Sequence, residues 1–260
     1  MRIAVIGAGG RIGREVVDVL KNRGDEIVEI TRTAGIDVLT GHGLAAAFAG
    51  AELVVDAVNA ETTDTAVVTE FFRTIARNVQ HAAAAACVRR IAVVSIIGID
   101  AFTAGHYAGK LAHERAYQEG PVPVRILRAA QFHEFTEMML DWTTVGDRAE
   151  IPAYRAQLVA ARTVAEHLAD LVHTDGPAVV EIAGPQQWRL VDAVARVAAR
   201  RGAPAQVVEV VDATDPDHRL QADGALLPGP GAVIAGPTFD EWLERRSGVG
   251  LASVPTESML

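Results

Sequence analysis

A cluster of glycines follows the first apolar run of the chain. Gly7, Gly10 and Gly13 recur at every third position, Gly9 is an additional glycine, and Ile12 stands where a G-x-G-x-x-G pattern would place its last glycine. Glycines here allow a tight turn and let phosphates approach the N–H groups at a helix N-terminus. Between an apolar strand and a helix, this spacing predicts a pyrophosphate site rather than a turn without a ligand. The predicted contacts are Gly7, Gly9, Gly10, Arg11, Ile12 and Gly13.

The end of the second apolar run indicates which dinucleotide would bind. Sites for NAD generally place an acidic side chain there, whereas sites for NADP offer arginine to the 2′-phosphate. Here the run ends Thr31-Arg32-Thr33, and strand alternation turns Glu29 elsewhere. The guanidinium groups of Arg32 and Arg11 could hold the phosphate by charge-assisted hydrogen bonds, the alternative being two solvated arginines. We predict NADP(H) as the cofactor, with Thr31, Arg32 and Thr33 among its contacts.

The elements that must position these residues alternate between strands and helices. Compact apolar runs predict strands buried on both faces, and the longer stretches between them have helical periodicity. Crossover helices of this kind make the sheet parallel and doubly wound. Strands are expected at residues 2–6, 26–31, 36–39, 53–58, 91–97, 122–127, 178–182 and 206–211. Helices are expected at residues 12–23, 43–49, 63–86, 105–118, 131–144, 163–172, 190–200 and 238–246, with a loop at 226–237.

The predicted fold class is therefore α/β, a doubly wound parallel sheet of the Rossmann type with a smaller C-terminal substrate-binding portion. Residues 1–130 form the expected NADP-binding core. Residues 131–246 form a mixed substrate-binding portion interleaved with that core, and residues 247–260 a frayed tail.

Composition limits the partners of the chain. Half of its 260 residues are hydrophobic, which is enough for a sizeable core, and the formal net charge is −9. A duplex-binding surface needs clustered positive charge, so nucleic acid is not an expected partner. No apolar stretch approaches the length of a membrane span, and the single cysteine, Cys87, fits a reducing compartment. We expect a cytoplasmic protein with a small-molecule substrate and no membrane partner; the sequence indicates no oligomeric state.

Several segments together resemble the atypical short-chain dehydrogenase/reductases, and most closely their NmrA-like, NAD(P)-binding branch. They are the glycine spacing, the Thr31-Arg32 ending, and residues 54–59, 93–98, 127–132, 182–185 and 239–243, so the resemblance covers nearly the whole chain. It implies that the adenine is bordered by Asp37 and Val38, the adenosine ribose by Ala57, Val58 and Asn59, and the nicotinamide by Gln131 and Phe132.

The resemblance also implies a catalytic group. Ser95 would end a strand beside the reacting carbon, as a hydrogen-bond donor rather than a nucleophile, because no base activates it. In reductases of this family a tyrosine, with a lysine four residues later, gives the carbonyl oxygen its proton. The lysine holds the nicotinamide ribose and lowers the pKa of the tyrosine. Lys110 fits the lysine position and is one of only two lysines among 24 basic residues.

The pattern departs from the family just before this lysine. His106, not tyrosine, stands four residues before Lys110, and Tyr107 stands three before it. Residues i−4 and i−3 both lie on the same side of a helix as residue i, so either ring could act, or both could simply cap the helix. Of the two we favour His106 as the acid, because an imidazole with a pKa of about 6.5 titrates near neutrality.

No metal site is predicted. His133 and Glu134 are adjacent, and Glu137 stands where an HExxH motif would place its second histidine. His133 is interpreted as pocket lining, and the acidic stretch 212–217 as solvated surface.

The leading hypothesis is an NADPH-dependent oxidoreductase acting on a small carbonyl, imine or activated alkene. The alternatives are a redox-silent NADP-binding sensor or regulator, and a non-redox isomerase or cyclase on the same fold.

Overall fold

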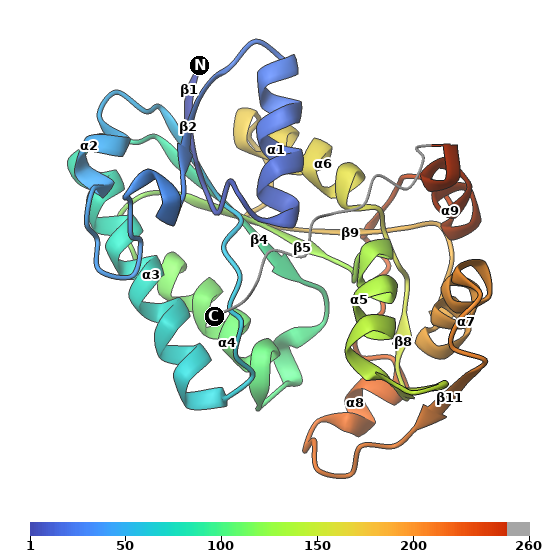
Figure 1. The fold of residues 1–260 in the computed structure, drawn as a ribbon. Coiled ribbons are helices and arrows are strands. Elements are labelled where there is room, and N and C mark those ends of the chain that lie inside the picture. Colours follow the sequence, from blue (N-terminus) through green and yellow to red (C-terminus); the bar gives the residue numbers. More distant parts are fainter. Residues whose placement is uncertain (249–260) are drawn as a thin grey trace.

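The computed structural model describes residues 1–248 and shows a seven-stranded parallel sheet with helices on both faces (Figure 1). The strands are β1 (Arg2–Ile6), β2 (Glu26–Ile30), β3 (Leu53–Asp56), β4 (Arg90–Ile96), β5 (Val124–Ala129), β9 (Val179–Ala183) and β12 (Val233–Ile234). Their order is β2-β1-β3-β4-β5-β9-β12, and every neighbouring pair is parallel. The strand order reverses at β1, where open α/β sheets bind ligands outside the carboxyl ends of their strands. The predicted fold class is confirmed.

Helices cover both faces of this sheet. On one face α1 (Arg11–Asn22) and α6 (Ala161–His173) lie side by side, and on the other are α2 (Leu44–Phe48), α3 (Thr65–Ala85) and α4 (Gly105–Gln118) (Figure 1). In β1, Ile3 and Val5 pack on the first face while Ala4 and Ile6 pack on the second. Both faces of the strand are therefore buried, which is why its sequence is apolar without alternation.

A second hydrophobic core lies in the smaller C-terminal part of the molecule, on the right in Figure 1. Its helices are α5 (His133–Thr143), α7 (Leu190–Arg201), α8 (His218–Asp223) and α9 (Phe239–Gly248). They pack with a small sheet of β6 (Thr144–Val145), β7 (Arg148–Pro152) and β11 (Gln206–Val210), and with the pair β8 (Arg155–Ala156) and β10 (Trp188–Arg189). In the described part of the chain, no helix is long and apolar enough to cross a bilayer.

Several sequence-predicted elements need correction. Residues 36–39 form no strand, because the Asp37 carboxylate accepts hydrogen bonds from Leu39 N and Thr40 N and the segment makes only a single bridge, Asp37 to His42. The expected loop 226–237 contains the edge strand β12, and β6, β7, β8, β10 and α8 were not predicted. The tail is predicted to begin at residue 247, but residues 247 and 248 belong to α9. The rest of the predicted tail, 249–260, lies outside the described residues.

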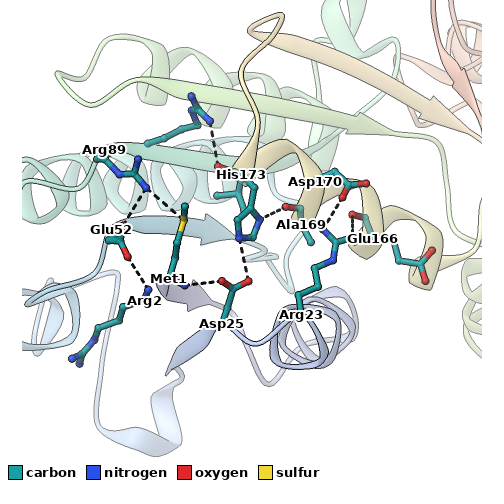
Figure 2. A network of polar contacts seen from close by, with 12 residues as sticks. Met1, Arg2, Arg23, Asp25, Glu52, Arg89, Glu166, Ala169, Asp170 and His173 are labelled. Atoms are coloured by element: carbon teal, nitrogen blue, oxygen red, sulfur yellow. Dashed lines mark hydrogen bonds and ion pairs between the residues drawn. The ribbon is translucent and has the colours of Figure 1, made fainter.

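A polar network lies at the amino ends of the strands (Figure 2). Asp25, which precedes β2, accepts a hydrogen bond from the Met1 ammonium at 2.9 Å and lies 3.1 Å from His173 Nε2 at the end of α6. Burial raises the pKa of Asp25, but these two partners outweigh it and hold the pKa below its ordinary value. Glu52 and Arg89 pair beside it at 3.2 Å. The chemistry-bearing residues lie at the opposite, carboxyl ends of the strands.

Candidate functional site

The turn between β1 and α1 has a backbone that only glycine can form. Gly7 adopts φ +73°, and a Cβ there would lie 2.9 Å from the Ala57 carbonyl oxygen. A Cβ on Gly13 would lie 2.0 Å from the Gly7 carbonyl oxygen, and Gly10 N donates to that same oxygen at 2.8 Å. No side chain caps α1, so its first N–H groups face outward. A turn this close to the backbone of residues 57–58, leading to an uncapped helix, fits a dinucleotide pyrophosphate.

The other residues of this turn have different surroundings. Ile12 is buried in the core beneath the turn, which explains why an apolar residue stands where the usual pattern has glycine. A Cβ on Gly9 would make only an ordinary contact, 3.7 Å from Thr31 Cγ2. Arg11 is exposed and acts electrostatically on Glu134, which lies at the start of α5.

The end of β2 continues into a short 3₁₀ turn, Arg32–Ala34. Thr31 Oγ1 caps this turn by accepting from Ala34 N, and Thr33 Oγ1 lies 3.0 Å from it. Arg32 is exposed, and its guanidinium lies 3.5 Å from Glu61. Among residues 1–248, Arg32 pairs with Glu61 and makes no contact with Arg11.

Glu29, in β2, points away from Arg32 and pairs with Lys21 at 2.6 Å.

The residues expected beside the adenine and its ribose lie in two further segments. The loop after β3 is fixed because Ala57 N donates to Ile6 O and Val58 N donates to Asp56 Oδ1 at 2.8 Å. Asn59 follows in the same loop. On the far side, Asn78 of α3 donates to the carbonyl oxygens of Val38 and Leu39. These contacts hold the residues expected beside the adenine and its ribose, Asp37, Val38, Ala57, Val58 and Asn59.

Helix α4 presents two stripes of functional side chains. The first, which we call the lysine stripe, consists of His106, Lys110, His113 and Tyr117. The second, the tyrosine stripe, consists of Tyr107, Leu111 and Glu114. Glu114 ties the second stripe to β5 through Arg128 at 2.7 Å. The rotation of the helix is thereby fixed, and it separates His106 from Tyr107.

The lysine stripe faces α3 and the buried end of β3. Lys110 is 4% exposed, its Nζ donates to the Val94 carbonyl oxygen at 2.9 Å, and it lies 4.9 Å from the centre of the Phe72 ring. Burial lowers the pKa of Lys110 to about 8, against the opposing charges of Asp56 and Glu114. Lys110 is therefore mostly protonated at pH 7.

His106 lies one turn before Lys110 and contacts the same Phe72 ring, centre to centre at 5.8 Å. Burial, and to a smaller extent the charge of Lys110, lowers the pKa of His106 to about 4. The ring is therefore neutral at pH 7. In that state it can donate a hydrogen bond, but imidazolium, the form that acts as an acid near neutrality, is almost absent.

A buried polar cluster below Lys110 was missed by the sequence reasoning. Asp56 is fully buried at the end of β3, where its Oδ2 accepts from Tyr117 Oη and lies 3.2 Å from His113 Nε2. Burial lowers the pKa of His113, so that ring is neutral and Asp56 carries the negative charge. The spacing of positions 106, 110, 113 and 117 along one helix face was the signal that could have revealed the cluster.

The tyrosine stripe faces the C-terminal part. Tyr107 packs edge-on against Phe102 at 4.7 Å between ring centres, and its hydroxyl lies 2.8 Å from that of Tyr154. Burial raises the pKa of Tyr107 to about 12, while Tyr154 and Gln131 favour the ionised form. Nothing in the local sequence around Tyr154 indicated this contact.

Four other predicted residues lie on β4 and at the start of α5. Ser95 is 3% exposed near the end of β4, on the strand face that α4 covers, and its Oγ has no hydrogen-bond partner within residues 1–248. Phe132 precedes α5 and packs on the core, and Gln131, next to it, borders Tyr107. His133 is buried, with Nε2 3.2 Å from the Pro237 carbonyl oxygen, so it belongs to the packing of α5. In the described residues, no group of His, Cys, Asp or Glu is placed to hold a metal ion.

The acidic stretch 212–217 is not simply solvated surface. Asp217 is 6% exposed and accepts hydrogen bonds from Thr103 N, Thr103 Oγ1 and Ala104 N, at 2.8 to 3.0 Å. These groups immediately precede α4, whose own N-cap, Ala104, offers no side-chain acceptor. The stretch therefore fixes the start of the helix that carries His106, Tyr107 and Lys110. It also lines a cavity of about 440 Å³ with Pro152 and Ala153.

Solved structures of nicotinamide-dependent enzymes are similar to this chain. The NADPH-dependent quinone oxidoreductase of Escherichia coli, in complex with NADPH, has a TM-score of 0.75 at 17% identity, over 94% of this chain and 99% of that one. The dTDP-4-dehydrorhamnose reductase of Bacillus anthracis, in complex with NADP, has a TM-score of 0.74 at 14% identity, over 96% and 99%. A short-chain dehydrogenase/reductase superfamily protein of Agrobacterium tumefaciens, with bound NAD, has a TM-score of 0.65 at 18% identity, over 96% and 98%.

The chain shares their fold. No protein-family model matches the sequence, and a comparison with curated proteins finds no match either. The resemblance to the short-chain dehydrogenase/reductases is thus confirmed at the level of the fold. The function has to be argued from the site itself.

Proposed function

We propose that the protein is an NADPH-dependent oxidoreductase that reduces a small organic substrate. The observation that carries this proposal is that one edge of the sheet joins two features. One is a turn, Gly7 to Gly13, that fits a pyrophosphate, and the other is α4, which carries a buried lysine on one face and a proton-bearing phenol on the neighbouring face. A structural turn would need the first feature but not the second.

The choice of NADP(H) rests on the end of β2. Arg32 is exposed there, and Glu29, the residue that could accept ribose hydroxyls, is engaged by Lys21. A guanidinium at this point offers two parallel N–H groups to a 2′-phosphate. Arg11 lies exposed in the adjoining turn and can supply a second charge.

The acid that the site supports best is Tyr107. NADPH, when bound, supplies the hydride. Tyr107 then gives its hydroxyl proton to the developing negative charge on the substrate, as a neutral phenol at pH 7. His106, neutral and beside Phe72, serves as a hydrogen-bond donor. Ser95, with its free Oγ, provides a further donor for the substrate.

Lys110 keeps a buried positive charge on the face of α4 that lies against β4, and the family resemblance gives a lysine at this place the role of holding the nicotinamide ribose. Its present partner, the Val94 carbonyl oxygen, leaves other N–H groups of the ammonium available for that ribose. Asp56, buried behind it, favours the protonated lysine.

The test uses the two lysines of the chain. NADPH oxidation is followed by its nicotinamide absorbance with soluble quinones, aldehydes, ketones, imines and enones. We expect turnover with at least one class, and Lys110→Met should lower kcat/KM roughly 100-fold or more by removing a charge that stabilises the transition state. Lys21→Met is the matched control and should stay within about twofold, because among residues 1–248 Lys21 pairs with Glu29 alone, at the surface.

Other outcomes would contradict the proposal. Tight NADPH binding without turnover across the panel would indicate the sensor or regulator. Product formation with no change in nicotinamide absorbance would indicate the isomerase or cyclase.

A further inference from the structure

A second phenol is placed directly behind Tyr107. Tyr154 lies between β7 and β8, and the chain separates it from Tyr107 by 47 residues, yet the two hydroxyl oxygens are 2.8 Å apart. Tyr154 is 4% exposed, and its ring packs in the C-terminal core near Phe135. The contact therefore joins α4, which packs on the main sheet, to the C-terminal part.

The direction of this hydrogen bond follows from the surroundings. The Tyr154 hydroxyl has no other hydrogen-bond partner among residues 1–248, so its proton has one acceptor, Tyr107 Oη. A buried hydroxyl that failed to donate would leave its proton without a partner, at a cost of about 1–3 kcal/mol. If Tyr154 donates, the proton of Tyr107 is free to point elsewhere.

Other groups near Tyr107 oppose or support its ionisation. Asp215, from the segment before α8, disfavours a negative charge on Tyr107, whereas Gln131 favours it. His106 is adjacent and neutral at pH 7. When Tyr107 loses its proton, the bond from Tyr154 becomes charge-assisted and roughly doubles in strength. The Tyr154 hydroxyl therefore stabilises Tyr107 most strongly after Tyr107 has lost its proton.

We propose that Tyr154 is a positioning residue that directs the Tyr107 proton toward the substrate and stabilises the phenolate left after proton transfer. The inference rests on the proposed function. In that step hydride from NADPH forms a C–H bond on the substrate while the Tyr107 O–H bond breaks and its proton goes to the substrate oxygen. The phenolate of Tyr107 accepts the Tyr154 hydrogen bond until water returns the proton.

The first experiment needs no substrate. The chain has three tyrosines, so protein labelled with 3-fluorotyrosine gives three fluorine NMR resonances, which Tyr→Phe variants assign. In Tyr154→Phe the Tyr107 titration should move to higher pH because a donor to its phenolate is gone, and the fraction of Tyr107 ionised at about pH 11 should fall roughly tenfold. In Tyr107→Phe the midpoint of Tyr154 should fall, because the neighbour that disfavours its ionisation is gone. An unchanged or lower Tyr107 midpoint in Tyr154→Phe would overturn the proposal.

The second experiment measures the reaction. With a substrate found in the NADPH panel, Tyr154→Phe should lower kcat roughly 10- to 100-fold, the size of one hydrogen bond to a charged group, and leave KM for NADPH within about twofold. Thr143→Val is the matched control, because it removes a hydroxyl that bonds only to the Met139 carbonyl oxygen of α5, and it should keep kcat and the Tyr107 midpoint. Unchanged kcat in Tyr154→Phe would refute the inference. If no compound is reduced, the proposed function fails, and the fluorine titration still decides how the two phenols interact.

Discussion

The replacement of Gly13 by alanine tests whether the turn before α1 binds the cofactor. The new Cβ would lie 2.0 Å from the Gly7 carbonyl oxygen, 2.6 Å from its carbon and 2.8 Å from Ala8 Cα. All three are backbone atoms, so no side chain can rotate to make room. The Gly7–Gly13 contact would be about 1.4 Å shorter than the 3.4 Å at which ordinary contact begins, and the turn has to move by roughly that distance.

A shift of this size displaces the N–H groups that would face a pyrophosphate. The loss of two hydrogen bonds to a charged group, at ~1.5–3 kcal/mol each, amounts to about 3–6 kcal/mol of binding free energy. At 1.4 kcal/mol per factor of ten, the Kd for NADPH should rise roughly 10²- to 10⁴-fold. Isothermal titration calorimetry measures the Kd, and circular dichroism and Tm report whether the variant still folds, with an expected overpacking cost of about 1–3 kcal/mol.

Gly231→Ala supplies a control outside the site. Beyond its chain neighbours, a Cβ at Gly231 has no other heavy atom of residues 1–248 within 4 Å, so the Kd of this variant should stay within about threefold of the unsubstituted protein. A folded Gly13→Ala protein with unchanged NADPH affinity would refute the assignment of this turn. Equal losses in Gly231→Ala and Gly13→Ala would refute the steric reasoning.

Two other predictions concern charged groups far from each other. Glu61→Gln should tighten NADPH binding roughly three- to fivefold and leave the affinity for NADH unchanged, because the Glu61 carboxylate pairs with Arg32 and would repel a 2′-phosphate. Glu119→Gln is the surface control. An equal effect of Glu61→Gln on the affinities for both dinucleotides would contradict this prediction. At the amino edge, Asp25→Asn should lower the free energy of unfolding by about 1–2 kcal/mol at pH 7, since it weakens the contact with His173 (Figure 2). The pKa of Asp25 is lowered by folding, so its contribution is complete above the ordinary value near 3.8 and is lost as pH falls through the folded value. Denaturant titrations should show the two proteins converging below pH 4, and a constant difference down to pH 2 would refute this assignment.

The main sheet could be predicted from the sequence because its strands carry their own signal. Residues 2–6 and 105–118 were predicted with the bounds that β1 and α4 have, and the other strands and helices of the first half agree within a few residues, apart from 36–39. A strand buried on both faces has to be apolar throughout, and a helix that covers it has to be apolar on one side, whatever their partners are.

The C-terminal part could be predicted less well because its short elements depend on distant partners. Strand β7 exists because Arg148–Pro152 pairs in parallel with Gln206–Val210, and β8 because Arg155–Ala156 pairs with Trp188–Arg189. Two-residue strands have no periodicity to detect. The position of Asp217 before α4 is of the same kind, since its donors lie more than a hundred residues away.

The sequence by itself determined that a glycine turn joins a buried strand to a helix, that an arginine follows the second strand, and that one of two lysines lies on a helix beside a histidine and a tyrosine. Only the tertiary structure decided where the His106 and Tyr107 side chains lie. Positions i−4 and i−3 differ by about 100° around a helix axis, too little to separate in a sequence. The packing of α4 against Phe72 on one side and Phe102 and Tyr154 on the other fixes its rotation, so the half-buried histidine lies on the lysine side of the helix and the tyrosine faces a second phenol.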